Sequence, residues 1–334
     1  MQPYTNIERQ QSGQAGPLTV SVVICSYSLD RYEQLVASAS SVLQQTAVPH
    51  QLVIVIDHNE FLRRRAEAEL VGAQVVPNRF EKGLSGGRNT GVIVSTGDVV
   101  AFMDDDAIAE PTWLERLVAP YADPNVLGTG GHIEPRWLQP RPEWFPEEFQ
   151  WVVGCSYRGL PRSMERIRNP IGCSMSFRRR ALIESGLFRT GVGRVGANLA
   201  GCEETELSIR AAARWPGGHI LYVPESRVHH LVPAARCTWT YFVKRCLGEG
   251  GSKAALAKLV GAHASSRAER RYALRTLPIG LARGVTDTLR GGRPGGLMRA
   301  TAIVIGLTAT AAGYAIGLVR AARARNALFT EVEP

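Results

Sequence analysis

Three consecutive carboxylates, Asp104, Asp105 and Asp106, directly follow the apolar run 99–103. Adjacent carboxylates repel one another and resist burial. The cluster therefore fits either a solvated turn behind a strand or an edge where a divalent cation and a phosphate offset the charge. In an extended turn Asp104 and Asp106 point to the same side, and both offer the oxygen ligands that a hard cation prefers.

A second acidic cluster comprises Glu203, Glu204 and Glu206, at the start of the helix-like segment 203–215. Acidic residues in a first turn favour the helix dipole, which would account for them in most proteins. A carboxylate within reach of a hydroxyl can also remove its proton as the oxygen attacks another atom. The second cluster is therefore either a helix start or a general base.

The elements that would position these residues alternate along the first 125 residues. Strand-like segments are 18–26, 51–57, 73–78 and 98–104, and helix-like segments are 30–45, 59–71 and 85–96. Continuous apolar strands between helices predict an α/β fold with a mostly parallel, doubly wound sheet. Ligands collect at the carboxyl ends of such strands, where Ser26, Asp57 and Asp104 lie. Asp57 could equally cap the helix that follows it.

The glycine-rich segment 83–89 (GLSGGRN) combines backbone flexibility with a guanidinium. Glycine allows close approach to a ligand, and Arg88 suits phosphate or ribose oxygens. A plain glycine-rich loop is the alternative, and a Walker loop is excluded because no G-K-[ST] follows. Further along, either imidazole of His229 and His230 can complete the shell of a cation.

Length, net charge and cysteine content limit the classes of protein to which this chain can belong. The chain has 334 residues, enough for one large domain or two smaller ones, and a formal charge of +9 that suits an anionic partner. The six cysteines show neither C-x-x-C nor zinc spacing, so we expect reduced thiols in a cytosolic environment. Residues 1–17 are polar and lack the apolar stretch of a signal peptide, and we expect them to be disordered.

Six ordered motifs between about residues 20 and 232 resemble glycosyltransferase family 2, whose members have the GT-A fold. The motifs are VVICSYSLDRYEQL, VIVIDHNE, NRFEKGLSGGRNTG, FMDDD, GCEETELSIR and VHH. They resemble, in order, the family's opening strand with its nucleotide loop, its base-reading strand end, the loop that crosses the nucleotide, the acidic D-x-D motif, the catalytic-base helix and a late metal ligand. The resemblance implies an inverting enzyme that moves one sugar from a nucleoside-diphosphate sugar, with UDP favoured, to a hydroxyl acceptor.

The same resemblance implies roles for individual residues. Glu204 or Glu203 would be the catalytic base, and the following ELSIR favours Glu204. Asp106 would be a direct ligand of Mg²⁺ or Mn²⁺, with His229 or His230 completing the shell. Asp104 would hydrogen-bond the ribose. The donor-binding residues would be Ser26, Tyr27, Asp57, Gly83, Arg88, Asn89, Asp104 and Asp105.

The sequence departs from the family pattern at three places. Glu-Glu at 203–204 replaces the more usual Glu-Asp, Ser174 stands where Asn is common, and Ala211 replaces the Gln of the Q-x-x-R-W motif of processive synthases. The last departure favours single-sugar transfer. Two other functions stay open: a sugar-phosphate nucleotidyltransferase, although it would typically have a glycine-rich basic loop after the first strand, and a non-catalytic membrane-binding module on a transferase scaffold.

The domain organisation expected from these patterns has two parts. We expect a GT-A catalytic domain over 18–235, with a nucleotide-binding half (18–125) and an acceptor-side half (126–235). A helical, basic, membrane-associated region would follow at 236–334. Within the acceptor half, 132–170 shows little periodicity and reads as a long excursion over the sheet edge. Its aromatic residues would form either a sugar-stacking wall or core packing: Trp137, Trp144, Trp151 and Tyr157.

The C-terminal region contains an uncharged stretch, 300–319, between Arg299 and Arg320. Twenty such residues could span a bilayer, or could lie in the headgroup region together with the apolar, arginine-containing stretch 272–290. A core or oligomer-interface helix is the third alternative. We expect a bacterial enzyme at the cytoplasmic face of the cell membrane, with a lipid-linked or cell-envelope glycan as acceptor and no nucleic-acid partner; a homo-oligomer stays open.

Overall fold

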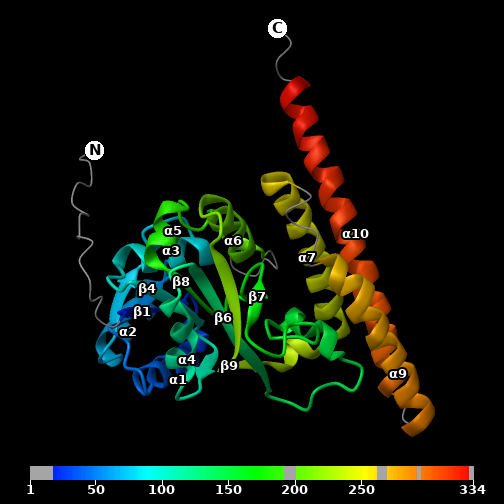
Figure 1. Cartoon of the computed structure of the whole chain (residues 1–334), viewed down its shortest axis with the longest axis horizontal. Coiled ribbons are helices and arrows are strands. Elements are labelled where there is room, and N and C mark those ends of the chain that lie inside the picture. Colours follow the sequence, from blue (N-terminus) through cyan, green and yellow to red (C-terminus); the bar gives the residue numbers. More distant parts are fainter. Residues whose placement is uncertain (1–17, 192–200, 262–268, 292–294, 331–334) are drawn as a thin grey trace.

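The computed structural model describes residues 18–191, 201–261, 269–291 and 295–330, so the N-terminal segment 1–17 lies outside the described residues. Four parallel strands form the first half of the sheet. Three of them are runs of mostly buried side chains, as the sequence predicts, whereas the edge strand Gln74–Pro77 buries only Val76. The four strands are β1 (Val20–Ser26), β2 (Gln51–Ile56), β3 (Gln74–Pro77) and β4 (Val99–Asp104). The helices that connect them are α1 (Tyr32–Leu43), α2 (Glu60–Glu69) and α3 (Leu84–Val94), with the short turn η1 (Leu29–Arg31) before α1 (Figure 1).

The second half of the sheet is mixed. The strands lie in the order β3-β2-β1-β4-β8-β6-β9-β5, and β7 pairs with β9 off this path. The added strands are β5 (Ala107–Ala109), β6 (Val126–Trp137), β7 (Glu165–Ile167), β8 (Ser174–Arg178) and β9 (His219–Val232). Between them lie α4 (Trp113–Val118), η2 (Ala119–Ala122), η3 (Glu147–Val153), α5 (Arg179–Glu184) and α6 (Glu203–Arg214). Because β8 runs antiparallel to β4, it begins at the edge where β4 ends. The strand β9 reaches the same edge near its own end, where His230 pairs with Ala107 of β5.

The excursion at 132–170 is ordered by aromatic packing. Trp144 stacks on Trp239 with a centroid distance of 4.0 Å, and the indole N–H of Trp151 donates to the Tyr272 hydroxyl at 3.1 Å. Tyr157 packs edge-on against Tyr272, and Trp137 packs against a phenylalanine of the same excursion. All four are therefore packing residues: Trp144, Trp151 and Tyr157 join the excursion to the C-terminal helices, and Trp137 packs within it.

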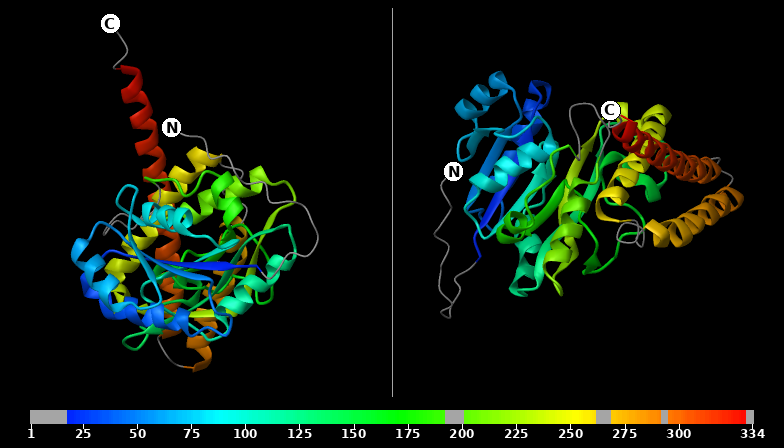
Figure 2. Two further views of the ribbon diagram at one scale, coloured as in Figure 1. Left: turned by 90° about the vertical axis from the view of Figure 1, so that its left-hand side faces the viewer. Right: turned by 90° about the horizontal axis from the view of Figure 1, so that it is seen from above.

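The C-terminal helices lie together at one side of the molecule, away from α1 and α2 (Figures 1 and 2). After η4 (Ala234–Cys237) they are α7 (Trp239–Val260), the short π-helix η5 (Tyr272–Thr276) that continues into α9 (Leu277–Gly291), and α10 (Gly295–Thr330). Within α10, the segment Gly295–Arg320 is long and apolar enough to cross a membrane by length and composition. The helical nature of this region agrees with the expectation from the sequence.

Candidate functional site

The acidic cluster lies where β4 ends and the chain turns into β5, and its charges are balanced by cations from other elements. Asp105 is buried and accepts a hydrogen bond from Ser26 Oγ at 2.6 Å. Arg31, from η1, forms ion pairs with Asp105 and with Oδ2 of Asp106, the latter at 2.6 Å. Burial raises the pKa of Asp105 to about 7, although Arg31 opposes this shift.

Asp106 has further partners from the strand β9 and the segment that follows it. His230 Nε2 lies 3.2 Å from Asp106 Oδ1, and Arg236 Nη2 lies 3.7 Å from Oδ2. Burial disfavours the imidazolium, but the Asp106 carboxylate outweighs burial and raises the pKa of His230 to about 10. For Asp106, burial is outweighed by His230 and the two arginines, so its pKa lies well below the usual range.

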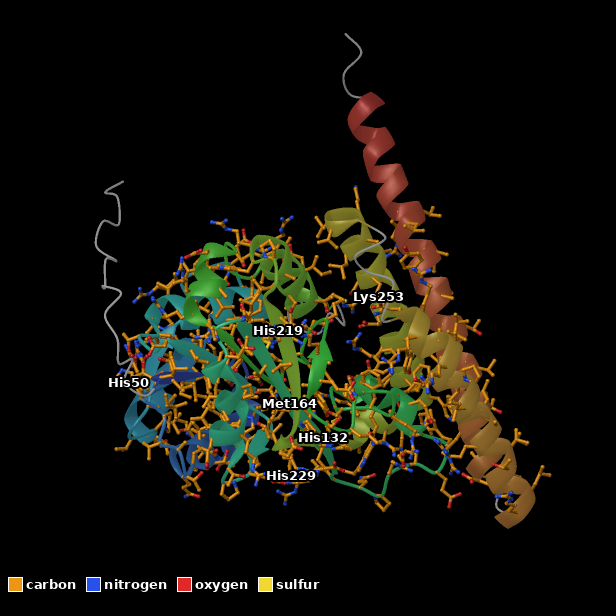
Figure 3. The ribbon with its side chains drawn as sticks, viewed as in Figure 1. His50, His132, Met164, His219, His229 and Lys253 are labelled. Atoms are coloured by element: carbon orange, nitrogen blue, oxygen red, sulfur yellow. The ribbon has the colours of Figure 1, made fainter. Side chains whose placement is uncertain are left out.

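His229 and His230 lie on opposite faces of β9, because successive side chains of a strand alternate. The His229 ring is 40% exposed, and its Nε2 lies 3.2 Å from Glu110 Oε1 (Figure 3). The structure thus brings His230 to the acidic cluster and places His229 outside it. The sequence left both histidines open as ligands.

The residues at this edge fit a divalent cation. One donor atom from each of Asp104, Cys173 and His230 lies within 4.8 Å of the others. In addition, Oδ1 of Asp106 is buried and accepts no well-aligned hydrogen bond among the described residues. Carboxylate oxygens and an imidazole suit Mg²⁺ or Mn²⁺, whereas the thiol is a softer ligand. Cys173 and Arg31 were not identified from the sequence, since only the antiparallel pairing of β8 with β4 and the turn after β1 bring them here.

A buried arginine joins the two acidic clusters. Arg88 is 2% exposed; its Nη1 donates to Glu203 Oε1 at 3.0 Å, and its Nη2 lies 3.8 Å from Asp104 Oδ1. It comes from the glycine-rich start of α3, where Gly83 has a φ of 131° that favours glycine. A side chain at position 172 would collide with the guanidinium, because a Cβ there would lie 2.4 Å from Arg88 Nη2. The glycine-rich segment therefore positions a cation between Asp104 and the start of α6.

The three glutamates at the start of α6 differ in their surroundings. Glu203 is buried and paired with Arg88, and Glu206 is fully buried and bound by Arg210 at 2.6 and 2.8 Å. Glu204 is partly exposed, and burial together with the neighbouring Glu203 raises its pKa to about 8, although Arg88 opposes the shift. Of the three, Glu204 has the accessibility and the pKa that a general base needs near neutral pH.

Asp57 is held by the loop before α3 and does not cap α2. Its two oxygens accept hydrogen bonds from Asn78 Nδ2 at 2.7 Å and from the Gly83 N–H at 2.9 Å. The cap of α2 is Asn59, whose side chain accepts from the Leu62 N–H. The helix-cap alternative for Asp57 is therefore wrong.

The remaining residues that the sequence predicts to bind the nucleotide-sugar donor are Tyr27 and Asn89, and they differ in exposure. Tyr27 is 46% exposed beside the acidic edge, with Arg31 5.9 Å from its ring centroid. Asn89 is buried, and its amide exchanges two hydrogen bonds of 2.8 Å with the backbone of Phe188. Tyr27 is thus open to a ligand, whereas the amide of Asn89 fixes the segment around Phe188.

Comparison with known proteins identifies the family. The family model described as Glycosyl transferase family 2 matches residues 21–186. The glucosyl-dolichyl phosphate glucuronosyltransferase of Haloferax volcanii is 39% identical over 240 residues, which cover 71% of this chain and 76% of that protein. The UDP-Glc:alpha-D-GlcNAc-diphosphoundecaprenol beta-1,3-glucosyltransferase WfgD of Escherichia coli is 29% identical over 117 residues, 34% of this chain and 46% of its own.

Among solved structures, the mannosyltransferase PcManGT from Pyrobaculum calidifontis, in complex with GDP-Man and Mn²⁺, is similar to this chain with a TM-score of 0.53. It is 19% identical, and the match covers 90% of this chain and 86% of that one. This similarity confirms the GT-A fold with a helical C-terminal extension. The identity and coverage of the Haloferax volcanii relative, together with the family model, show that this chain belongs to glycosyl transferase family 2.

Proposed function

We propose that this glycosyltransferase moves one sugar from a nucleoside-diphosphate sugar, with UDP as the favoured nucleotide, to a hydroxyl of a lipid-linked glycan, with inversion at the anomeric carbon. The observation that carries the proposal is the position of Arg88, between Asp104 of the first acidic cluster and Glu203 of the second. A donor bound at the end of β4 and an acceptor bound at the start of α6 would then meet at one place.

The donor would lie across the carboxyl ends of β1, β2 and β4. Asp57 would accept a hydrogen bond from the base, Tyr27 would contact the nucleotide from its exposed position, and Asp104 would hydrogen-bond the ribose. Ser26 and Asp105 hold this edge through their mutual hydrogen bond. Gly83 allows close backbone approach, and Asn89 supports the site from behind.

A divalent ion, Mg²⁺ or Mn²⁺, would be held by Asp106 and His230, and when bound it supplies charge stabilisation for the leaving diphosphate. Arg31 and Arg236 lie beside the same carboxylates and would face the diphosphate oxygens as well. Arg88 adds a third guanidinium on the side toward α6.

Glu204 would be the general base. It takes the proton of the acceptor hydroxyl while the oxygen forms a bond to the anomeric carbon and the bond from that carbon to the diphosphate breaks. Attack opposite the leaving group inverts the configuration. Glu203, which is paired with Arg88, would keep the arginine in place. Positioning the two substrates next to each other would contribute as much to the rate as proton transfer does.

The lipid-linked acceptor is supported by two relatives whose names include a dolichyl phosphate and a diphosphoundecaprenol. A lipid-linked substrate would place the enzyme at a membrane, with the nucleotide-sugar donor at its cytoplasmic face. Family membership favours glycosyl transfer over nucleotidyl transfer and over a non-catalytic module.

The experiment is a transfer assay with a panel of UDP- and GDP-sugars, Mn²⁺ and polyprenyl-phosphate sugars as acceptors, read by mass spectrometry. Wild type should add one sugar, and Glu204→Gln should lose transfer while still binding the donor. The matched control is Glu67→Gln, an exposed glutamate on α2 paired only on the surface with Arg63, which should keep full activity. Transfer by Glu204→Gln at the wild-type rate would remove the assignment of the base.

A further inference from the structure

The helices α9 and α10 present large apolar side chains to solvent on their outer faces. The exposed residues before and on α9 are Leu274, Ile279, Val285 and Leu289, and those on α10 are Leu297, Met298, Val304, Leu307, Ile316, Leu318 and Val319. Their exposed fractions run from 40% for Met298 to 80% for Leu289. These side chains recur along two helices that pack together, and a large exposed apolar surface marks a site that another phase or molecule covers.

The inner face of α10 is made of small residues that dock on the rest of the chain. A Cβ on Gly296 would lie 2.4 Å from the Gly284 carbonyl of α9, and one on Gly306 would lie 2.4 Å from the Phe149 ring. Further along, a Cβ on Gly313 would lie 2.1 Å from the Leu247 carbonyl of α7. The G-x-x-x-G pair of Gly313 and Gly317 is therefore a packing site for α7.

This docking extends over the length that would have to cross a bilayer. From Gly296 to Gly317 the helix rises about 32 Å at 1.5 Å per residue, and the hydrocarbon core of a bilayer is about 30 Å thick. Over that whole length α10 contacts η3, α7 or α9. A perpendicular orientation of α10 would therefore draw these neighbours into the hydrocarbon.

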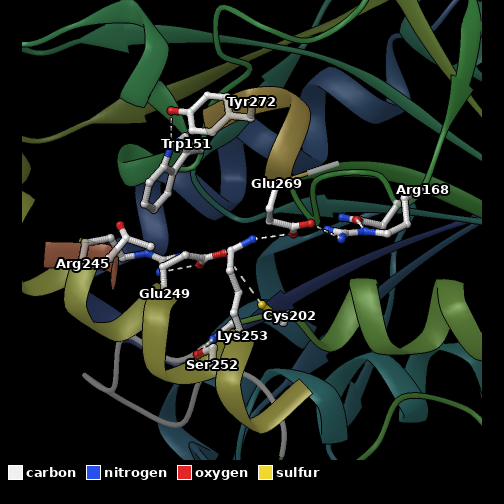
Figure 4. A network of polar contacts seen from close by, with 12 residues as sticks. Trp151, Arg168, Cys202, Arg245, Glu249, Ser252, Lys253, Glu269 and Tyr272 are labelled. Atoms are coloured by element: carbon white, nitrogen blue, oxygen red, sulfur yellow. Dashed lines mark hydrogen bonds and ion pairs between the residues drawn. The ribbon is translucent and has the colours of Figure 1, made fainter. Parts of the chain in front are cut away.

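The neighbours of α10 carry ionised groups that hydrocarbon would not accept. On α7, Arg245 pairs with Glu249 at 2.9 Å, and Lys253 pairs with Glu269 at 2.7 Å (Figure 4). Beside Gly280 of α9, Arg283 pairs with Glu148 at 3.1 Å. Moving such groups into hydrocarbon is strongly unfavourable. A helix docked in this way lies along a membrane surface more favourably than across it.

The excess of positive charge in residues 269–320 favours an anionic partner. Residues 269–320 contain eight arginines and two acidic residues. Arg275 of η5 and Arg290 of α9 lie in sequence next to Leu274 and Leu289, the first and last exposed apolar residues of this segment. Two copies of the chain joined through this face would bring like charges together, whereas anionic lipid headgroups complement them.

We propose that α9 and α10 lie in the plane of an anionic lipid surface, with their outer apolar faces in the headgroup and acyl boundary, and that neither helix spans the bilayer. This inference deepens the proposed function, because a lipid-linked acceptor would reach the catalytic domain from the same surface. Membrane attachment and sugar transfer are separate observables, since vesicle binding can be measured without any substrate.

The first test measures flotation of the purified full chain with phosphatidylcholine vesicles, with and without phosphatidylglycerol. The double variant Val304→Asp/Ile316→Asp changes the outer face of α10, and Phe61→Asp/Val71→Asp is the matched control, since these residues are 82% and 86% exposed on the catalytic domain. The α10 variant should bind anionic vesicles on the order of tenfold less tightly or worse, and the control should bind as wild type does. Equal binding of all three proteins, or a dimer that the α10 variant dissociates while no vesicle binding occurs, would overturn the proposal.

The second test separates an in-plane helix from a spanning one. Protease-cleavable tags are placed at the N-terminus and after Pro334, and cleavage is followed in inverted and right-side-out membrane vesicles from expressing cells. Both tags should be cleaved in vesicles of the same orientation. Cleavage of the two tags in vesicles of opposite orientation would mean that the chain crosses the bilayer.

A water-soluble, short-chain acceptor analogue keeps this inference apart from the proposed function. The α10 variant should transfer sugar to the analogue as wild type does while losing transfer to vesicle-bound acceptor. If wild type binds anionic vesicles but transfers sugar to neither acceptor, the proposed function is wrong, whereas the proposal that α9 and α10 bind a lipid surface is still supported.

Discussion

The guanidinium of Arg88 donates to the carboxylate of Glu203 at 3.0 Å, although 115 positions separate the two residues. The same guanidinium lies 3.8 Å from Asp104. One buried cation therefore connects the end of β4 with the start of α6. The two acidic clusters, which the sequence alone can only list, face a common centre.

Replacing Arg88 should affect both stability and activity. Arg88→Met leaves Glu203 buried without its partner, and breaking a buried ion pair costs about 3–5 kcal/mol of unfolding free energy. Urea unfolding measures this loss. The double variant Arg88→Met/Glu203→Gln should recover part of the stability, because no buried charge is then unpaired. Arg64→Ala, an exposed α2 arginine paired with Glu60, should change stability by less than about 0.5 kcal/mol.

The rate of transfer should rise with pH as Glu204 loses its proton. Because its pKa is raised to about 8 in the folded enzyme, the base form increases up to and above that pH. The raised pKa also means that the protonated group favours the folded state, so this contribution to stability is present below the unfolded pKa of 4.5 and is lost as the pH rises through 8. Initial rates of donor turnover between pH 6 and 9.5 (roughly one and a half to two units around the pKa) check the first claim. A rate that is independent of pH across this window would contradict the role of Glu204.

Arg31 should oppose cation binding in the absence of nucleotide. Its guanidinium pairs with Asp105 and Asp106, so its positive charge lies where a divalent ion would meet the same carboxylates. Arg31→Gln should bind Mn²⁺ about tenfold more tightly in calorimetry without nucleotide and should bind nucleoside diphosphate more weakly. Arg65→Gln, on the exposed side of α2, is the control. Unchanged Mn²⁺ affinity in the Arg31 variant would show that the arginine does not compete with the ion.

The polar network on α7 should limit stability in acid. The Glu249 carboxylate is paired with Arg245 and Lys253, and although burial opposes them these cations lower its pKa to about 2. The stabilisation is present above the unfolded pKa of 4.5 and is lost as the pH falls toward 2. Thermal unfolding is measured between pH 7 and pH 3 (about the range over which this carboxylate titrates). At pH 7 Glu249→Gln should have a lower unfolding midpoint than wild type, and this midpoint should fall less than that of wild type as the pH decreases. A variant as stable as wild type at pH 7 would contradict the importance of this network.

The sequence predicts the parallel half of the fold well, because its signals are local. Apolar runs such as 51–57 and the helix-like 59–71 correspond to β2 and α2 within a few residues. The strand β6 extends into the segment that shows little periodicity. The sequence does not predict it there, because its Gly, Pro and charged residues give no strand-like pattern and its pairing partners are distant in sequence. Pairing of β8 with β4 likewise depends on contacts that no local pattern contains.

The site shows the same division between local and distant information. Asp104, Asp105 and Asp106 follow directly from the end of an apolar run. The choice of His230 over His229 depends on which face of β9 meets β5, and the role of Arg31 depends on the path of the chain after β1. The sequence does not decide whether Asp57 caps α2 or faces a ligand, because only the structure shows that Asn59 caps this helix.

The most direct test of the central claim is a crystal structure with Mn²⁺ and a non-hydrolysable nucleotide sugar, with the ion located by its anomalous signal. The account predicts the ion on Asp106 and His230, beside the diphosphate, and the anomeric carbon on the side that faces Glu204. An ion bound elsewhere, or a sugar whose anomeric carbon is turned away from α6, would contradict it.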